Sequence, residues 1–177
     1  MTPIDRLARI ERKRLALLEE VAALDEVTLT ARPMAGKWSI REIVEHLVLA
    51  EDDVVGDFSR LDALDAQPRG IGHHVRYLIV LFVLRFRIPV TVPSRAMLPT
   101  GGRSLAELRE TWDEHQRRLR SFVAGLTREG ARRAIFRHPI SGPLSVSQAL
   151  VLLDAHLDSH IRQIRRRMQL LRAAHPG

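Results

Sequence analysis

Residues 145–171 read SVSQALVLLDAHLDSHIRQIRRRMQLL, and this stretch decides the fold class. Ser145 and Gln148 have the spacing of a capping box, in which each side chain bonds to the other residue's backbone N–H at the start of a helix. The apolar residues that follow recur every three or four positions, which is the period of an amphipathic helix. They are Leu150, Leu153, Leu157, Ile164, Met168 and Leu171. We therefore predict a long final helix that buries one face.

Three segments upstream show the same period, and each has a start signal of its own. Thr2 to Asp5 predicts a helix that ends near Leu24. Ser39 and Glu42 form a capping box for a helix to about Leu64, and Ser104 and Glu107 form one for a helix to about Leu126. Four long amphipathic helices bury their apolar faces best against one another. The sequence thus predicts an all-α protein, an antiparallel four-helix bundle in one domain over residues 1–177.

The connection between the second and third long helices is unusually long. Gln67 to Gly70 interrupts the helical pattern, and His73 to Arg87 predicts an extra short helix. An extended, proline-containing segment follows, because a proline cannot continue a helix. Within it, Pro89 to Val92 is the only doubtful strand signal that we find. The class therefore stays all-α.

Composition restricts the chemistry. The 177 residues include no cysteine, which excludes disulfides, thiolate metal ligands and a protein-borne thiol nucleophile. The formal net charge is +7, but arginines alternate with acidic residues along the helices, so we expect no nucleic-acid partner. The apolar run from Tyr77 to Leu84 is too short to span a bilayer, and we expect no membrane partner. The first residues do not read as a signal peptide, so we expect a cytoplasmic protein.

The final helix also offers two metal ligands. His156 and His160 are four residues apart, so their side chains lie on one face, at or beside the apolar seam. Two buried imidazoles need polar partners, and a metal ion would serve both. The alternative is two unrelated histidines, one in the core and one on the surface. His46 flanks the apolar stripe of the second helix in the same way and is a candidate third ligand.

Two blocks resemble the DinB/YfiT-like metalloenzyme superfamily. Residues 38–47 read WSIREIVEHL and are similar to the opening of that family's second helix. Residues 138–145, HPISGPLS, and 154–164, DAHLDSHIRQI, are similar to its last turn and last helix. The resemblance implies that His46, His156 and His160 bind one divalent ion, most commonly zinc or nickel. It also implies a homodimer, since members of the family often dimerise.

Helix geometry suggests residues that would orient the imidazoles or a bound water. Gln163 lies one turn beyond His160, Asp53 two turns after His46, and Glu42 one turn before it. Each has a simpler alternative: a polar seam position for Gln163, an exposed site for Asp53 and the capping box for Glu42.

The remaining aromatic and histidine side chains give weaker signals. Trp38 and Met34 are candidates for the mouth of the site, although Trp38 is equally a packing residue before the cap. His115 is either a fourth ligand or partner, or a surface residue. We expect surface or loop roles for His73 and His74, a structural role for His138 beside a turn proline, and a fraying tail at His175.

Three histidines leave a coordination position open, which is typical of a catalytic metal. Such an ion lowers the pKa of a bound water or of a substrate thiol. From the resemblance, the leading prediction is a metal-dependent S-transferase or detoxifying enzyme that acts on a small molecule with a low-molecular-weight thiol. The alternatives are a metal-hydroxide hydrolase and a non-catalytic bundle that dimerises or binds a ligand through the apolar segment Tyr77 to Phe86.

Overall fold

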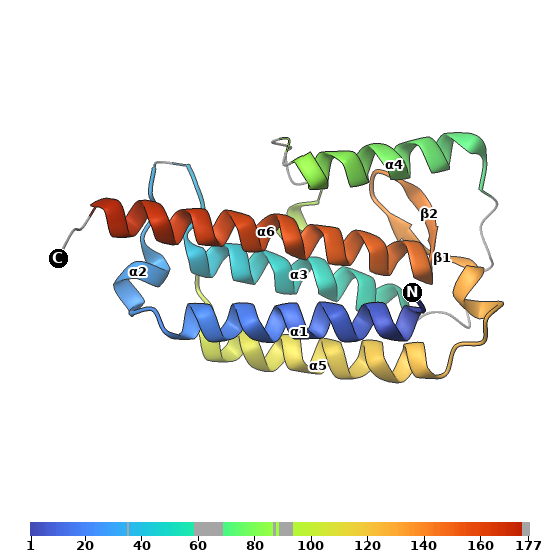
Figure 1. Ribbon diagram of the computed structural model, residues 1–177, viewed down its shortest axis with the longest axis horizontal. Coiled ribbons are helices and arrows are strands. Elements are labelled where there is room, and N and C mark those ends of the chain that lie inside the picture. The colour runs from blue at the N-terminus through green and yellow to red at the C-terminus, as the bar shows by residue number, and fades with distance from the viewer. Residues whose placement is uncertain (35, 59–68, 87, 89–93, 175–177) are drawn as a thin grey trace.

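The computed structural model describes residues 1–34, 36–58, 69–86, 88 and 94–174. Four long helices make up the bundle: α1 (Pro3–Ala22), α3 (Ile40–Phe58), α5 (Leu105–Ala124) and α6 (Val146–Ala174). In Figure 1 they lie side by side along the long axis of the molecule. The all-α prediction is confirmed. None of the helices in the described part of the chain has the length and apolar character needed to cross a membrane.

The helix directions follow from the long connection. In Figure 1, α1 and α6 run one way and α3 and α5 run the other way, as the colour gradient shows. Ion pairs from Arg6 to Asp154 and from Arg165 to Glu20 join corresponding ends of α1 and α6, so these neighbours are parallel. The connection between α3 and α5 carries the chain back along the bundle before α5 begins. Antiparallel packing is therefore found between α1 and α5 and between α3 and α6.

The predicted start signals are present as hydrogen bonds. At α3, Glu42 N–H donates to Ser39 Oγ over 3.2 Å, and Ser39 N–H donates to the Glu42 carboxylate over 2.7 Å. The Thr2 cap of α1 and the Ser104 cap of α5 are reciprocal in the same way. At α6, Gln148 N–H bonds to Ser145 Oγ and Ser145 N–H bonds to the Gln148 amide oxygen. Such a cap typically contributes about 1 kcal/mol to stability.

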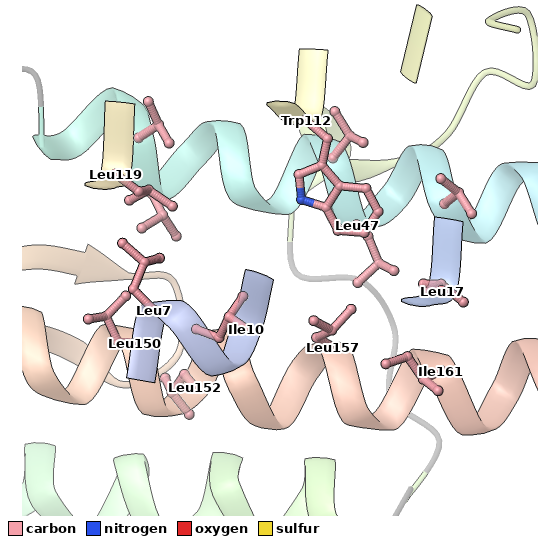
Figure 2. Packing of buried hydrophobic residues seen from close by; sticks show 14 of the residues in the cluster. Leu7, Ile10, Leu17, Leu47, Trp112, Leu119, Leu150, Leu152, Leu157 and Ile161 are labelled. Carbon is pink, nitrogen blue, oxygen red and sulfur yellow. The ribbon is translucent and has the colours of Figure 1, made fainter. Parts of the chain in front are cut away.

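The apolar faces of the four helices meet in one core. Figure 2 shows Leu7 and Ile10 of α1 beside Leu150 and Leu152 of α6, with Trp112 of α5 on the far side. Each of these side chains is buried. Burial of a leucine or isoleucine side chain stabilises the fold by roughly 1.5–3 kcal/mol. Of the predicted apolar residues of α6, Leu150, Leu157 and Ile164 are buried, and Leu153, Met168 and Leu171 are partly buried against the core.

Several predicted boundaries are corrected. Helix α1 ends at Ala22 rather than near Leu24, and α5 ends at Ala124 rather than near Leu126. A short helix, α2 (Glu26–Thr30), follows α1, where we had expected only a loop; Asp25 caps it. The description of α3 stops at Phe58, so the predicted end near Leu64 lies outside the described residues. The doubtful strand Pro89 to Val92 and His175 lie outside them too.

The extra helix is α4 (Ile71–Phe86), close to the predicted range, and it packs along α6 on the outside of the bundle (Figure 1). A 3₁₀ turn, η2 (Arg95–Met97), leads from the proline-containing segment toward α5, and a second one, η3 (Gly130–Arg132), follows α5.

A β-hairpin that we did not predict precedes α6. Strand β1 (Ala134–His138) pairs antiparallel with β2 (Gly142–Ser145), with Phe136 opposite Leu144, and both of those side chains are buried. Gly142 has φ +75°, and a Cβ there would lie 2.9 Å from the ring of His73. Only glycine fits this turn against α4.

Candidate metal centre

The three predicted histidines converge between α3 and α6. His46 Nε2 lies 3.3 Å from His156 Nε2, which lies 3.1 Å from His160 Nε2. One ring nitrogen of each residue lies within 4.8 Å of those of the other two, and in the described part of the chain no aspartate or glutamate belongs to this group. His46 is buried, and His156 and His160 are half-buried. We call these three side chains the histidine cluster.

The outward nitrogens of two imidazoles are already used. His46 Nδ1 lies 2.8 Å from the carbonyl oxygen of Met97, and His160 Nδ1 lies 2.7 Å from the amide oxygen of Gln163. Both contacts require a proton on Nδ1, because the oxygens only accept. In a neutral ring the Nε2 atom then carries a lone pair. Nε2 of His46 and Nε2 of His160 therefore both present lone pairs toward Nε2 of His156.

One proton cannot satisfy this arrangement. A proton on Nε2 of His156 would serve one neighbour and leave the other lone pair facing it without a donor. Protonating a second ring would place charge among desolvated imidazoles, which is unfavourable. A cation among the three nitrogens satisfies all of them at once.

The pKa values point the same way. Burial lowers the pKa of His46, and burial together with the neighbouring imidazoles lowers that of His156 well below its usual value. Burial, opposed by the bond to Gln163, lowers the pKa of His160 to about 4. All three rings are thus neutral near pH 7, which is the protonation state that a metal ligand requires.

The spacing suits a small divalent ion. Two ligands of a tetrahedral zinc ion, each about 2.0–2.1 Å from the metal, lie about 3.3 Å apart. The two short Nε2 separations of 3.3 and 3.1 Å match this edge. The cluster is therefore able to hold a metal ion through nitrogen alone, and the chain has no cysteine that could add a thiolate.

A buried carboxylate holds the chain a few residues after the carbonyl that orients His46. Glu45, next to His46 on α3, accepts hydrogen bonds of 2.8 Å from both Thr100 Oγ1 and Gly101 N–H. These bonds hold the segment that directly follows η2. Met97 is the last residue of η2. Gly101 has φ +74°, so glycine is favoured at this turn. The sequence reasoning missed Glu45, because its contacts span 55 and 56 residues; the glycine pair after Thr100 was the only local signal.

Trp38 forms one wall of the histidine cluster. Its ring centroid lies 4.9 Å from that of His46, and the side chain also packs against the core, so the packing role considered for it is confirmed. Met34 is largely exposed. His156 and His160 are less completely buried than His46.

The three residues expected to assist the histidines have different positions. Gln163 bonds directly to His160, as described above. Glu42 accepts bonds from Arg32 and Ser39, so its carboxylate serves the cap and an ion pair. Asp53 is exposed on α3. Gln163 therefore contacts a histidine of the cluster, whereas the bonds of Glu42 go to Arg32 and to the cap.

The other histidines belong to separate environments. His115 is buried and its Nε2 lies 3.2 Å from Asp52, so it is neither a surface residue nor a member of the cluster. His138 Nδ1 accepts the backbone N–H groups of Ile140 and Ser141, which fixes the hairpin turn. Burial lowers the pKa of His138 to about 4. His73 packs on Gly142 and accepts the N–H of Gly70, whereas His74 is exposed.

Comparison with known families agrees with this geometry. Residues 9–164 match the DinB superfamily. The chain belongs to the DinB superfamily. The match covers α3 and α5 completely, most of α1 and α6, and all three histidines of the cluster. No curated protein and no solved structure matched the chain in the corresponding comparisons. The DinB assignment and the histidine cluster together support a metal site whose ion is not identified.

Proposed function

We propose that this DinB superfamily protein is a metal-dependent enzyme that transfers a low-molecular-weight thiol to an electrophilic small molecule. The observation that carries the proposal is the set of three neutral imidazoles whose inward nitrogens meet without donors. Three nitrogen ligands leave a coordination position for a substrate atom. A divalent ion bound there lowers the pKa of the group that it coordinates.

The surroundings of the histidine cluster favour a thiol over water as the nucleophile. A free thiol has a pKa of about 8.5, whereas bulk water has one of about 15.7, so a thiol needs less assistance to ionise. Hydrolytic sites commonly add a carboxylate base, as in metalloproteases with two histidines and a glutamate. Here Glu42 is engaged by Arg32 and Ser39, and Asp53 is exposed. The absence of cysteine is consistent with a thiol supplied from outside.

The residues of the chain have distinct tasks in this proposal. Met97 and Gln163 fix the protons of His46 and His160 on Nδ1, so that the lone pairs face inward. Trp38 excludes water from one side of His46. The half-exposed rings of His156 and His160 form the side that a substrate approaches. We propose zinc or nickel as the ion, because both accept imidazole ligands.

The test combines metal analysis with a panel of thiols. Purified protein is expected to hold about one divalent ion per chain, and His46→Ala, His156→Ala and His160→Ala to lose it. His74→Ala is the matched control, since it removes an exposed imidazole outside the cluster. Consumption of monobromobimane should require both the ion and one thiol of the panel. Activity that survives chelation would contradict a metal-dependent enzyme, and turnover without any thiol would indicate hydrolysis instead.

A further inference from the structure

Helix α4 has two apolar faces, and the bundle covers only one of them. Val80 is buried, and Tyr77, Leu81 and Leu84 pack against the core along α6. On the opposite side, six apolar side chains are exposed: Ile71, Val75, Leu78, Ile79, Phe82 and Phe86. We call these six the outer stripe. Figure 1 shows α4 on the outside of the bundle, with α6 on one side of it only.

The outer stripe is continuous rather than scattered. Its members recur at intervals of three, four and one, so they form a single band along the 16-residue helix. Leu78 is 62% exposed and Phe82 is 53% exposed, although leucine and phenylalanine are usually buried. A contiguous exposed patch of this kind marks a docking surface.

The positive charge around the outer stripe indicates which kind of partner surface would bind it. The sequence from Arg69 to Ala106 contains six arginines and no aspartate or glutamate. Arg76, Arg85 and Arg95 are exposed, and their side chains form no ion pair or hydrogen bond with any other described residue. The rest of the chain mixes both signs, so this segment is a local concentration of positive charge beside apolar surface.

The arginines of α4 lie along the edges of the outer stripe, where they would contact the headgroups of a lipid surface. At 100° per residue, Arg76 and Arg85 fall on opposite edges of the outer stripe, each about a quarter of a turn from its centre. A helix with an apolar band and arginines along its edges lies in the plane of a bilayer interface, with the apolar side chains below the headgroups. The arginines then contact anionic headgroups.

A second copy of the chain fits less well. Pairing two outer stripes through a twofold axis would bring the arginines of both copies to the same edges, and α4 contributes no acidic residue to oppose them. Like charges at an interface oppose association. We propose that the outer stripe docks this protein on the surface of a membrane that contains anionic lipids. This replaces the expectation of no membrane partner with surface binding, which needs no spanning segment.

The test is co-sedimentation of the full chain with vesicles. Vesicles of phosphatidylcholine with about one third phosphatidylglycerol are compared with phosphatidylcholine alone. Tighter binding to the anionic vesicles is expected, weakening as salt is added. Leu78→Asp with Phe82→Asp should weaken binding at least tenfold, and Arg76→Gln or Arg85→Gln about fivefold each. Val27→Asp, at a 78% exposed position on α2, is the matched control and should keep most of the binding.

The outcomes separate the possible occupants. Binding to anionic vesicles that the α4 variants lose and Val27→Asp keeps would support the proposal. Equal binding by wild type and the double variant, or no binding to anionic vesicles at low salt, would overturn it. Sedimentation equilibrium that shows a dimer dissociated by Leu78→Asp would also overturn it, because the stripe would then be a subunit interface. Circular dichroism checks that each variant is folded.

Discussion

Helix α3 takes part in two buried polar clusters that face different neighbours. Toward α6 it contributes His46 to the histidine cluster. Toward α1 and α5 it contributes Glu51, which is 2% exposed and accepts hydrogen bonds from Trp112 Nε1 over 2.9 Å and Gln116 Nε2 over 2.6 Å. Arg14 of α1 interacts electrostatically with Glu51 and stacks over the ring of Trp112. We call these four residues the core polar network.

The two clusters differ in how their polar atoms are satisfied. Both Glu51 oxygens have donors. The Arg14 guanidinium donates to Glu11 over 2.8 Å and forms an ion pair with Asp113 at 2.6 Å, although its Nη1 atom makes no hydrogen bond. In the histidine cluster, acceptors face acceptors. Burial is common to both, so burial alone does not distinguish structure from function. A polar cluster whose charges and donors meet opposite partners stabilises the fold, whereas one whose acceptors face one another is suited to hold a cation.

The largest expected contrast is in folding stability without metal. Arg14→Met leaves Glu11, Glu51 and Asp113 without their buried cation and should lower the free energy of unfolding by about 3 kcal/mol. His156→Ala removes a half-buried ring that faces two lone pairs, and should change the free energy of unfolding by less than about 1 kcal/mol. Urea denaturation with a chelator present measures both. Equal destabilisation by the two substitutions would show that the histidine cluster is also structural.

The second contrast concerns pH. Burial raises the pKa of Glu51 to about 7, against the opposing effects of Trp112, Gln116 and Arg14. The folded state therefore binds this proton more tightly than the unfolded state, in which glutamate has a pKa near 4.5. The contribution of Glu51 to the free energy of unfolding is fully present below about pH 4.5. It falls as pH rises to about 7 and is constant above that.

Glu51→Gln isolates this effect, because glutamine does not titrate. The unfolding free energy of wild type minus that of Glu51→Gln should fall by about 3 kcal/mol between pH 4.5 and 7.5. The subtraction matters because histidines with lowered pKa values, such as His138 and His160, have the opposite effect: their contribution to the unfolding free energy decreases as pH falls below about 6.5. A difference that stays flat over this range would mean that Glu51 is ionised in the folded protein.

The sequence predicted what depends on local spacing. Capping boxes span three residues, so the starts of α3, α5 and α6 could be read directly from Ser39, Ser104 and Ser145. His156 and His160 share a face by helix geometry alone. That His46 joins them depends on the packing of α3 against α6, which the family resemblance supplied and local spacing could not.

Other features could not be predicted from the sequence. Some are elements too short to show a periodic pattern, and others depend on contacts between residues far apart in the chain. The strands of the hairpin have five and four residues, with a register shift between Ala134 and Phe136, so no alternation is visible. Helix α2 has five residues, little more than one turn. Glu51 reads as one more acid beside Asp52 and Asp53, and only the packing of α3 against α5 shows that it is buried.

The smallest expected effect is on metal affinity, through residues that position the imidazoles. Glu45 holds Thr100 and Gly101, and thereby the carbonyl of Met97 that orients His46. Glu45→Ala should weaken metal binding about tenfold, within the range typical of residues that support a ligand. Glu45→Gln keeps one acceptor and should recover part of the loss. Gln163→Ala, which frees the ring of His160, should have a similar effect.

Glu42→Gln is the control for these substitutions, since Glu42 is a buried carboxylate of the same helix turn that serves the cap and Arg32. It should lower stability but leave metal affinity within about twofold of wild type. Competition with a chromophoric chelator measures affinity, and thermal unfolding of the metal-free protein measures stability. If Glu45→Ala and Glu42→Gln reduce stability alike and neither alters affinity, then Glu45 supports the fold only. A specific loss of affinity in Glu45→Ala and Gln163→Ala would instead show that the lone pairs of the histidine cluster are aimed by their outer partners. In the core polar network, by contrast, Glu51 receives both of its donors from Trp112 and Gln116 within the network itself.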